Sequence, residues 1–121
     1  MVLDTNILIA YLNGEEIVVK TITGWKKEGR PLFISAITFS EVLSLPQLGN
    51  AEVNRIKLFL NSFISIPFTN ATGETASLLR RLYRLTIPDA AIAASALVNR
   101  VPLVTRDKQF SKVKEIIIVK I

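Results

Sequence analysis

Four acidic residues occur where the chain is otherwise apolar, or where an apolar run gives way to a helix. Asp4 lies inside the apolar N-terminal run, Asp89 opens an alanine-rich stretch, and Asp107 follows an apolar run near the C-terminus. Glu41 lies three residues after Thr38, in what is predicted to be the first turn of a helix. A carboxylate among apolar residues costs free energy unless it is paired or binds a cation. We therefore expect these four acids to form one site.

The residue types exclude several kinds of catalysis. The chain contains no histidine and no cysteine, which rules out Ser-His-Asp and Cys-His nucleophiles, imidazole or thiolate zinc sites, and ribonuclease chemistry based on a histidine pair. Carboxylates that come within a few ångströms of one another must take up protons or bind a cation. An all-oxygen ligand set favours Mg²⁺ or Mn²⁺, which can hold a phosphate oxygen and activate water. The acids therefore predict metal-dependent attack on phosphorus.

Apolar runs bounded by turn residues alternate with segments of helical periodicity. The predicted strands are residues 2–3, 31–35, 63–67, 101–105 and 116–119. The predicted helices are residues 6–12, 15–27, 38–45, 51–60, 70–85 and 89–98. Short apolar strands that alternate with helices are typical of a parallel sheet covered on both faces. We predict a single three-layer α/β/α domain over residues 1–121. Ligands bind such sheets at the carboxyl ends of the strands, where the four acids would meet.

The charge balance favours a polyanionic partner. Lysine and arginine number 15 against 10 acidic residues, which gives a net charge of +5. A basic exterior around an acidic site makes nucleic acid the natural substrate, because lysine and arginine can hold the flanking phosphates. The lack of cysteine and of a basic leader is consistent with a cytoplasmic protein. The longest uncharged stretch, residues 58–73, is too short to span a bilayer, so we expect no membrane partner.

Each acid also has a purely structural interpretation. Asp4 and Asp89 could be ordinary helix caps, and Asp107 an ordinary turn residue. The pattern Thr38-x-x-Glu41 is also that of a capping box, in which the glutamate only satisfies backbone donors. Taken singly, these structural roles are the more common ones, although Asp4 is harder to explain in this way. The matching positions of all four acids favour a shared site.

Four segments together resemble the motifs of PIN domains, and most closely those of VapC-type toxins from prokaryotic toxin–antitoxin pairs. The segments are Leu3-Asp-Thr-Asn-Ile-Leu-Ile9, Ile37-Thr-Phe-Ser-Glu-Val-Leu43, Pro88-Asp-Ala-Ala-Ile-Ala-Ala-Ser-Ala-Leu97 and Leu103-Val-Thr-Arg-Asp-Lys-Gln-Phe110. The resemblance implies a Mg²⁺- or Mn²⁺-dependent endoribonuclease that uses water to cut the phosphodiester bond. Asn6 and Thr105 match positions that orient the acids or hold the attacking water. The metal ligands that the resemblance implies are Asp4, Glu41, Asp89 and Asp107.

The resemblance also implies the strand order 3-2-1-4-5, a homodimer, and inhibition by an antitoxin that blocks or enters the acidic pocket. The apolar residues of helix 51–60 could supply a dimer or antitoxin surface, or could simply pack in the core. Gln109 is a departure, because many relatives carry a further acid at this position, two residues after the fourth acid. This departure favours one tightly held ion over a fully occupied second metal site.

Several basic residues could contact RNA. Arg80, Arg81 and Arg84 lie on a predicted helix shortly before the third acid, and they could hold phosphates or form a solvated basic face. Arg106 and Lys108 flank the fourth acid, and either could contact substrate or balance local charge.

Other functions were weighed on the same residues. An aspartyl phosphatase would need a second aspartate two residues after the first, and Asn6 occupies that position. A phospho-receiver domain would need an aspartate after the third strand, and none follows Pro67. An RNA-maturation nuclease remains an alternative to a toxin. So does a non-catalytic PIN-like module that binds RNA or a partner, although loss of an acid would signal such a module and all four acids are present.

Overall fold

Five short strands form one parallel sheet in the order β3-β2-β1-β4-β5, as the resemblance implied. The computed structural model describes residues 1–121. The strands are β1 (Val2–Leu3), β2 (Phe33–Ser35), β3 (Ile64–Ile66), β4 (Leu103–Val104) and β5 (Ile118–Val119). The helices are α1 (Thr5–Leu12), α2 (Glu16–Lys27), α3 (Ala36–Leu43), α4 (Asn50–Leu60), α5 (Asn70–Tyr83) and α6 (Ile87–Val98), with a short 3₁₀ helix, η1 (Lys108–Lys112).

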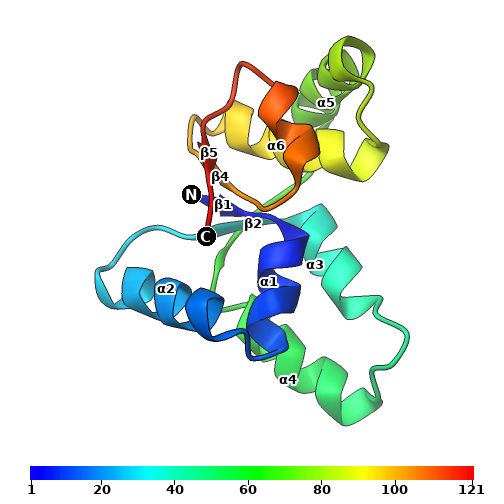
Figure 1. Ribbon diagram of the computed structural model, residues 1–121. Helices are drawn as coiled ribbons and strands as arrows, with labels where there is room; N and C mark the ends of the chain where they lie inside the picture. Colours follow the sequence, from blue (N-terminus) through cyan, green and yellow to red (C-terminus); the bar gives the residue numbers. More distant parts are fainter.

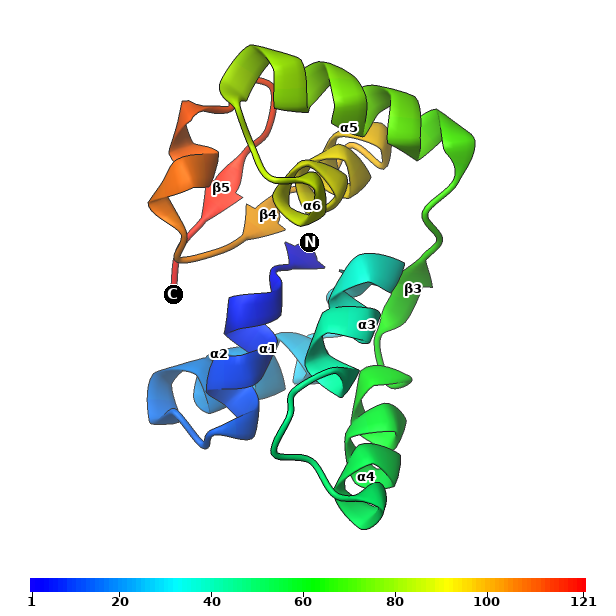
Figure 2. The same ribbon diagram turned by 90° about the vertical axis from the view of Figure 1, so that its right-hand side faces the viewer.

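The predicted three-layer arrangement is confirmed. Figures 1 and 2 show α5 and α6 on one face of the sheet and α1 to α4 on the other. Successive residues of a strand point to opposite faces. Accordingly, Val2 and Leu103 belong to the apolar core under α5 and α6, whereas Leu3 and Val104 belong to the core under the other helices. Both faces of each central strand are buried, which is why these strands are continuously apolar.

Polar residues at the carboxyl ends of the strands start the helices that follow. The Asp4 carboxylate accepts a hydrogen bond from the backbone N–H of Thr5 and caps α1, and Ser35 caps α3 through the N–H of Ile37. Asp107 caps η1 in the same way, through the N–H of Gln109. Because neighbouring strands are parallel, these caps lie along one edge of the sheet.

Two sequence-based placements of acids were wrong. Helix α3 begins at Ala36 rather than at Thr38, so Glu41 lies in the second turn of the helix and is not part of a capping box. Ser35, at the end of β2, caps this helix. Similarly, α6 begins at Ile87 and is capped by Thr86, so Asp89 is the third residue of the helix and not its cap.

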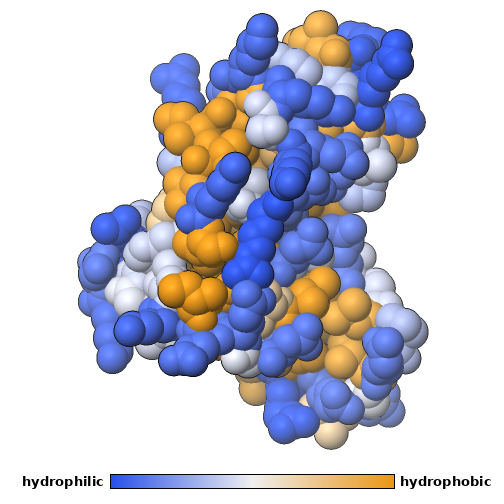
Figure 3. All heavy atoms as spheres, viewed as in Figure 1, coloured by the Kyte–Doolittle hydropathy of each residue, from blue (hydrophilic) through white to orange (hydrophobic).

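The surface has one conspicuous apolar hollow. It lies between α1, α4 and the segment before α4, where Figure 3 shows hydrophobic residues in the lower part of the molecule. Its apolar lining is Ile9, Leu12, Leu45, Leu48, Ile56 and Phe59. Leu60 of α4 is fully buried in the core, while Ile56 and Phe59 pack partly against it and line the hollow. None of the helices combines the length and the apolar character that crossing a membrane requires.

Candidate functional site

Asp4 is the centre of the site, and its carboxylate is almost completely buried. Its side chain is 3% exposed. The two carboxylate oxygens accept separate hydrogen bonds, Oδ1 from the backbone N–H of Thr5 at 2.8 Å and Oδ2 from the Thr105 hydroxyl at 2.7 Å. Thr105 is itself buried at the end of β4, so the bond joins two neighbouring strands. Asp4 is therefore both a helix cap and a fixed acid at the edge of the sheet.

The three aspartates share one electrostatic environment. The pKa of Asp4 is raised to about 6, chiefly by burial and to a smaller extent by the charges of Asp89 and Asp107, against the lowering effect of its two hydrogen bonds. The pKa of Asp89 is also raised, first by burial and then by the charge of Asp107. Asp89 and Asp107 are only half-buried, so solvent reaches both. The charges of three aspartates from separate segments of the chain thus act on one another.

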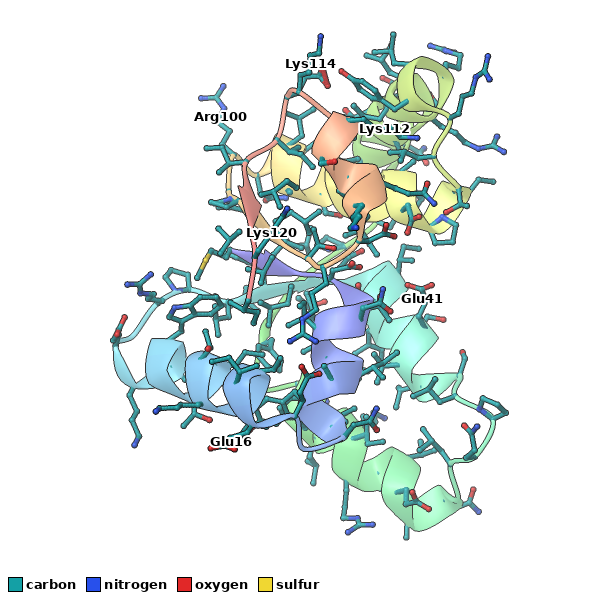
Figure 4. The ribbon with its side chains drawn as sticks, in the orientation of Figure 1. Glu16, Glu41, Arg100, Lys112, Lys114 and Lys120 are labelled. Atoms are coloured by element: carbon teal, nitrogen blue, oxygen red, sulfur yellow. The ribbon has the colours of Figure 1, made fainter.

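Glu41 is connected to this group through Thr5. The Thr5 hydroxyl donates to Glu41 Oε1 at 2.7 Å, and its oxygen lies 3.1 Å from the Thr38 hydroxyl. Since Thr5 has one hydroxyl proton, which the carboxylate attracts more strongly, Thr38 acts as the donor to Thr5. Figure 4 shows Glu41 beside the end of α3 that lies nearest the sheet, which agrees with the tendency of helical side chains to lean toward the N-terminus. The network ties α3 to α1 next to Asp4.

Sequence reasoning missed Thr5 and misassigned Thr38. Both side chains are buried, and together they fix the Glu41 carboxylate. The available signal was a hydroxyl residue directly after Asp4. Asn6, which was expected to orient the acids, is exposed and forms no side-chain hydrogen bond within the protein.

The donor set suits a hard divalent ion chemically, but the acids are not gathered into a ligand set. Carboxylate and hydroxyl oxygens are the ligands that Mg²⁺ and Mn²⁺ prefer. A cation beside Asp4 would also offset the repulsion from Asp89 and Asp107 that raises its pKa. In the observed arrangement, however, no three acidic side chains lie close enough together to hold an ion. Asp4 and Asp107 are turned toward backbone donors, and Glu41 is turned toward Thr5.

Of the two basic residues beside Asp107, only Lys108 is free to contact a ligand. Arg106 forms a two-point ion pair with Glu15, with nitrogen–oxygen distances of 2.6 and 2.9 Å, and also donates to the carbonyl of Ile121. Its guanidinium is thus used in holding the C-terminus. Lys108 is exposed and forms no ion pair, so it can reach a ligand.

The three arginines lie around one hollow. Arg80 and Arg81 belong to the last turn of α5, and Arg84 directly follows that helix. All three line a surface hollow together with Ser77 and Leu85. The sequence placed Arg84 on the helix, whereas it is the left-handed residue that ends it.

Comparison with solved structures identifies similar chains. A chain in a toxin–antitoxin complex from Klebsiella pneumoniae is 31% identical, with a TM-score of 0.83 over 98% of this chain and 94% of that one. VapBC2 from Rickettsia felis, solved bound to a promoter DNA fragment, contains a chain of 21% identity, with a TM-score of 0.85 over 99% and 97% of the two chains. VapBC-5 from Mycobacterium tuberculosis gives 20% identity and a TM-score of 0.69 over 99% and 97%. At these lower identities the likeness shows the fold alone.

No curated protein sequence matches the chain. The model of the family described as PIN domain, in contrast, matches residues 1–116. That match spans β1 to the segment before β5, and so includes every element that carries one of the four acids. The chain belongs to the PIN domain family.

Proposed function

We propose that the protein is a Mg²⁺- or Mn²⁺-dependent endoribonuclease and the toxin of a toxin–antitoxin pair. PIN domains are generally nucleases that use divalent metal ions, and the most similar chain described above, at 31% identity, belongs to a toxin–antitoxin complex. The observation that carries the proposal is the buried Asp4, whose pKa is raised to about 6 by burial and by the charges of two other aspartates. Perturbed acids grouped at the carboxyl edge of a parallel sheet are typical of functional sites.

The metal ligands in this proposal are Asp4, Glu41, Asp89 and Asp107. A bound Mg²⁺ or Mn²⁺ supplies a Lewis acid for a phosphodiester oxygen and lowers the pKa of water. The protein's part is to fix the acids. Thr105 and the N–H of Thr5 hold Asp4, while the Thr5 hydroxyl holds Glu41.

The chain has no histidine for proton transfer, and a carboxylate of the site can take that role. Asp89 is the best suited of the four, since its pKa is raised and its half-buried side chain is open to solvent. A raised pKa brings a carboxylate closer to the working pH, where a general base is most effective. In this scheme Asp89 would take the proton from the attacking water through the carboxylate oxygen that does not bind the ion.

The test is cleavage of single-stranded RNA by the purified protein with millimolar Mg²⁺ or Mn²⁺. We expect cleavage that EDTA abolishes and that falls at least about a hundredfold in Asp4→Asn and in Asp89→Asn, the lower end of what acid–base catalysis contributes. Glu16→Gln is the matched control, because this exposed acid on α2 projects away from the site (Figure 4). Undiminished cleavage in both aspartate variants would contradict the assignment of the site.

The proposed protein partner is an antitoxin, and a second copy of the chain is a further expected partner. Co-expression with the product of a short neighbouring reading frame should yield a complex that elutes as one species and no longer cleaves RNA. A neighbouring product that neither binds nor inhibits would favour a nuclease of RNA maturation instead.

A further inference from the structure

A hollow at the C-terminal end of α5 concentrates positive charge that no acidic side chain neutralises. Three of its five lining residues are arginines, namely Arg80, Arg81 and Arg84, and all three are exposed. The ion pairs of the protein are Arg30 with Glu28 and Arg106 with Glu15, so none of the three arginines of the hollow is paired with an acid. Three unpaired guanidinium groups around one hollow form a site for an anion.

Arg80 is held in place while most of its donors remain free. Its Nε donates to the carbonyl of Leu85 at 3.2 Å. A guanidinium has five N–H donors, so the four on its two terminal nitrogens are left for a ligand. Planar guanidinium groups match the geometry of phosphate and bind it through paired hydrogen bonds.

Arg84 has a left-handed backbone conformation, in which glycine would be less strained. It ends α5 with φ 54° and ψ 39°, in the left-handed region. Helices commonly end in this conformation with glycine, because a side chain there strains the backbone. Favourable interaction of a cation with the helix C-terminus could account for Arg80 and Arg81 in the last turn. That interaction does not require a strained third arginine directly beyond them.

The hollow lies close to the acidic site along the chain. Leu85 lines the hollow, Thr86 caps α6, and Asp89 lies in the first turn of that helix. Five residues, even fully extended, place the Cα atoms of Arg84 and Asp89 at most about 18 Å apart. We propose that this arginine hollow binds a backbone phosphate of the RNA strand whose neighbouring phosphodiester lies at the aspartates. The inference rests on the proposed function for the identity of the anion.

The structure supplies a matched control in Arg100. Arg84 and Arg100 are the only residues other than glycine with positive φ, at 54° and 55°. Arg100 follows the end of α6, whereas Asp89 lies at the beginning of that helix, and Figure 4 shows it projecting on the side opposite Glu41. Replacing either arginine by glycine removes one charge and one strained residue, but only Arg84 lines the hollow.

The test measures binding of a fluorescent single-stranded RNA by anisotropy in EDTA, so that the RNA stays intact. Arg84→Gly should weaken binding about fivefold or more and reduce the slope of log K against log salt by about one, as loss of one phosphate contact predicts. Arg100→Gly should leave binding within about twofold. Both variants should raise the melting temperature by a few degrees, since both relieve the same backbone strain.

Three results would overturn the proposal: equal weakening by both variants, no weakening by Arg84→Gly, or loss of affinity for an acidic peptide partner without loss for RNA. The double variant Arg80→Gln/Arg81→Gln, which leaves the strained residue in place, provides a second measure and should also weaken RNA binding. Because binding is measured without metal, failure to cleave RNA would refute the proposed function while leaving this result standing. Normal cleavage with unchanged RNA affinity in Arg84→Gly would refute only the phosphate site.

Discussion

Replacing Asp4 by asparagine should make the protein more stable at pH 8 while it abolishes cleavage. The carboxylate is 3% exposed and carries a pKa of about 6, chiefly because burial disfavours its charged form. Above pH 6 the folded protein must therefore hold an ionised group in a place that favours the neutral form. Asparagine has nearly the same shape and no charge.

The magnitude follows from the pKa. The difference between about 6 in the folded protein and an ordinary value of about 3.9 is worth about 3 kcal/mol, at about 1.4 kcal/mol per pH unit. A pKa raised by folding means that the folded state binds the proton more tightly, so this stability is fully present below about pH 4 and is lost as the pH rises to about 6. Asparagine retains an acceptor for the N–H of Thr5 but cannot accept the Thr105 proton, which costs about 1 kcal/mol.

When the free energy of unfolding is measured by urea denaturation in EDTA, the curves of wild type and Asp4→Asn against pH should therefore cross. At pH 8 the variant should be about 2 kcal/mol more stable than the wild type, whereas at pH 4 the two should be nearly equal or the variant slightly weaker. Glu16→Gln removes one exposed carboxylate and serves as the control, for which no such crossing is expected. A stability difference between Asp4→Asn and wild type that is the same at both pH values would show that Asp4 is not held at a raised pKa.

Three further outcomes follow from the same contacts. Thr105→Val removes the bond to Asp4 and the acceptor of the Asp107 N–H, so denaturation should show a loss of about 1–3 kcal/mol, and the pH–rate profile of cleavage should move to higher pH. Thr5→Val frees Glu41 and should reduce cleavage, whereas Thr5→Ser keeps the hydroxyl and should restore it; equal activity in the two variants would argue against this positioning role. Millimolar Mg²⁺ should raise the melting temperature of the wild type and should do so much less in Asp4→Asn, as calorimetry can measure.

The sequence predicted the layers and the positions of Asp4 and Asp107 because both depend on local patterns. Continuously apolar strands need two covered faces, and Val2 and Leu3 indeed enter the two separate cores. Asp4 lies directly beyond β1 and Asp107 three residues beyond β4, where a helix cap and a ligand-binding edge coincide. Their placement therefore followed from the strand ends alone.

The parts that could not be predicted depend on contacts between distant segments. Thr5 bonds Glu41 only because α1 packs against α3, and no local pattern marks that pair. The sequence also could not show that Arg106 is paired and Lys108 is not, since the ion pair of Arg106 joins residues that are 91 positions apart. The strain at Arg84 depends on where α5 ends, and the sequence pattern extended that helix to Leu85.

Gln109 shows how the structure changes the meaning of a sequence departure. In the sequence, the missing acid at this position favoured one tightly held ion over a fully occupied second metal site. The backbone N–H of Gln109 nevertheless donates to Asp107 Oδ1 at 2.9 Å, and the N–H of Asp107 donates to Thr105, so Asp107 is held by contacts that need no acid at position 109. Gln109 is exposed and uncharged, so it adds no further negative charge to this site. The charges of two aspartates already raise the pKa of Asp4 there. One carboxylate fewer leaves less negative charge for a second cation to offset, so under the proposed function Gln109 favours one divalent ion over two.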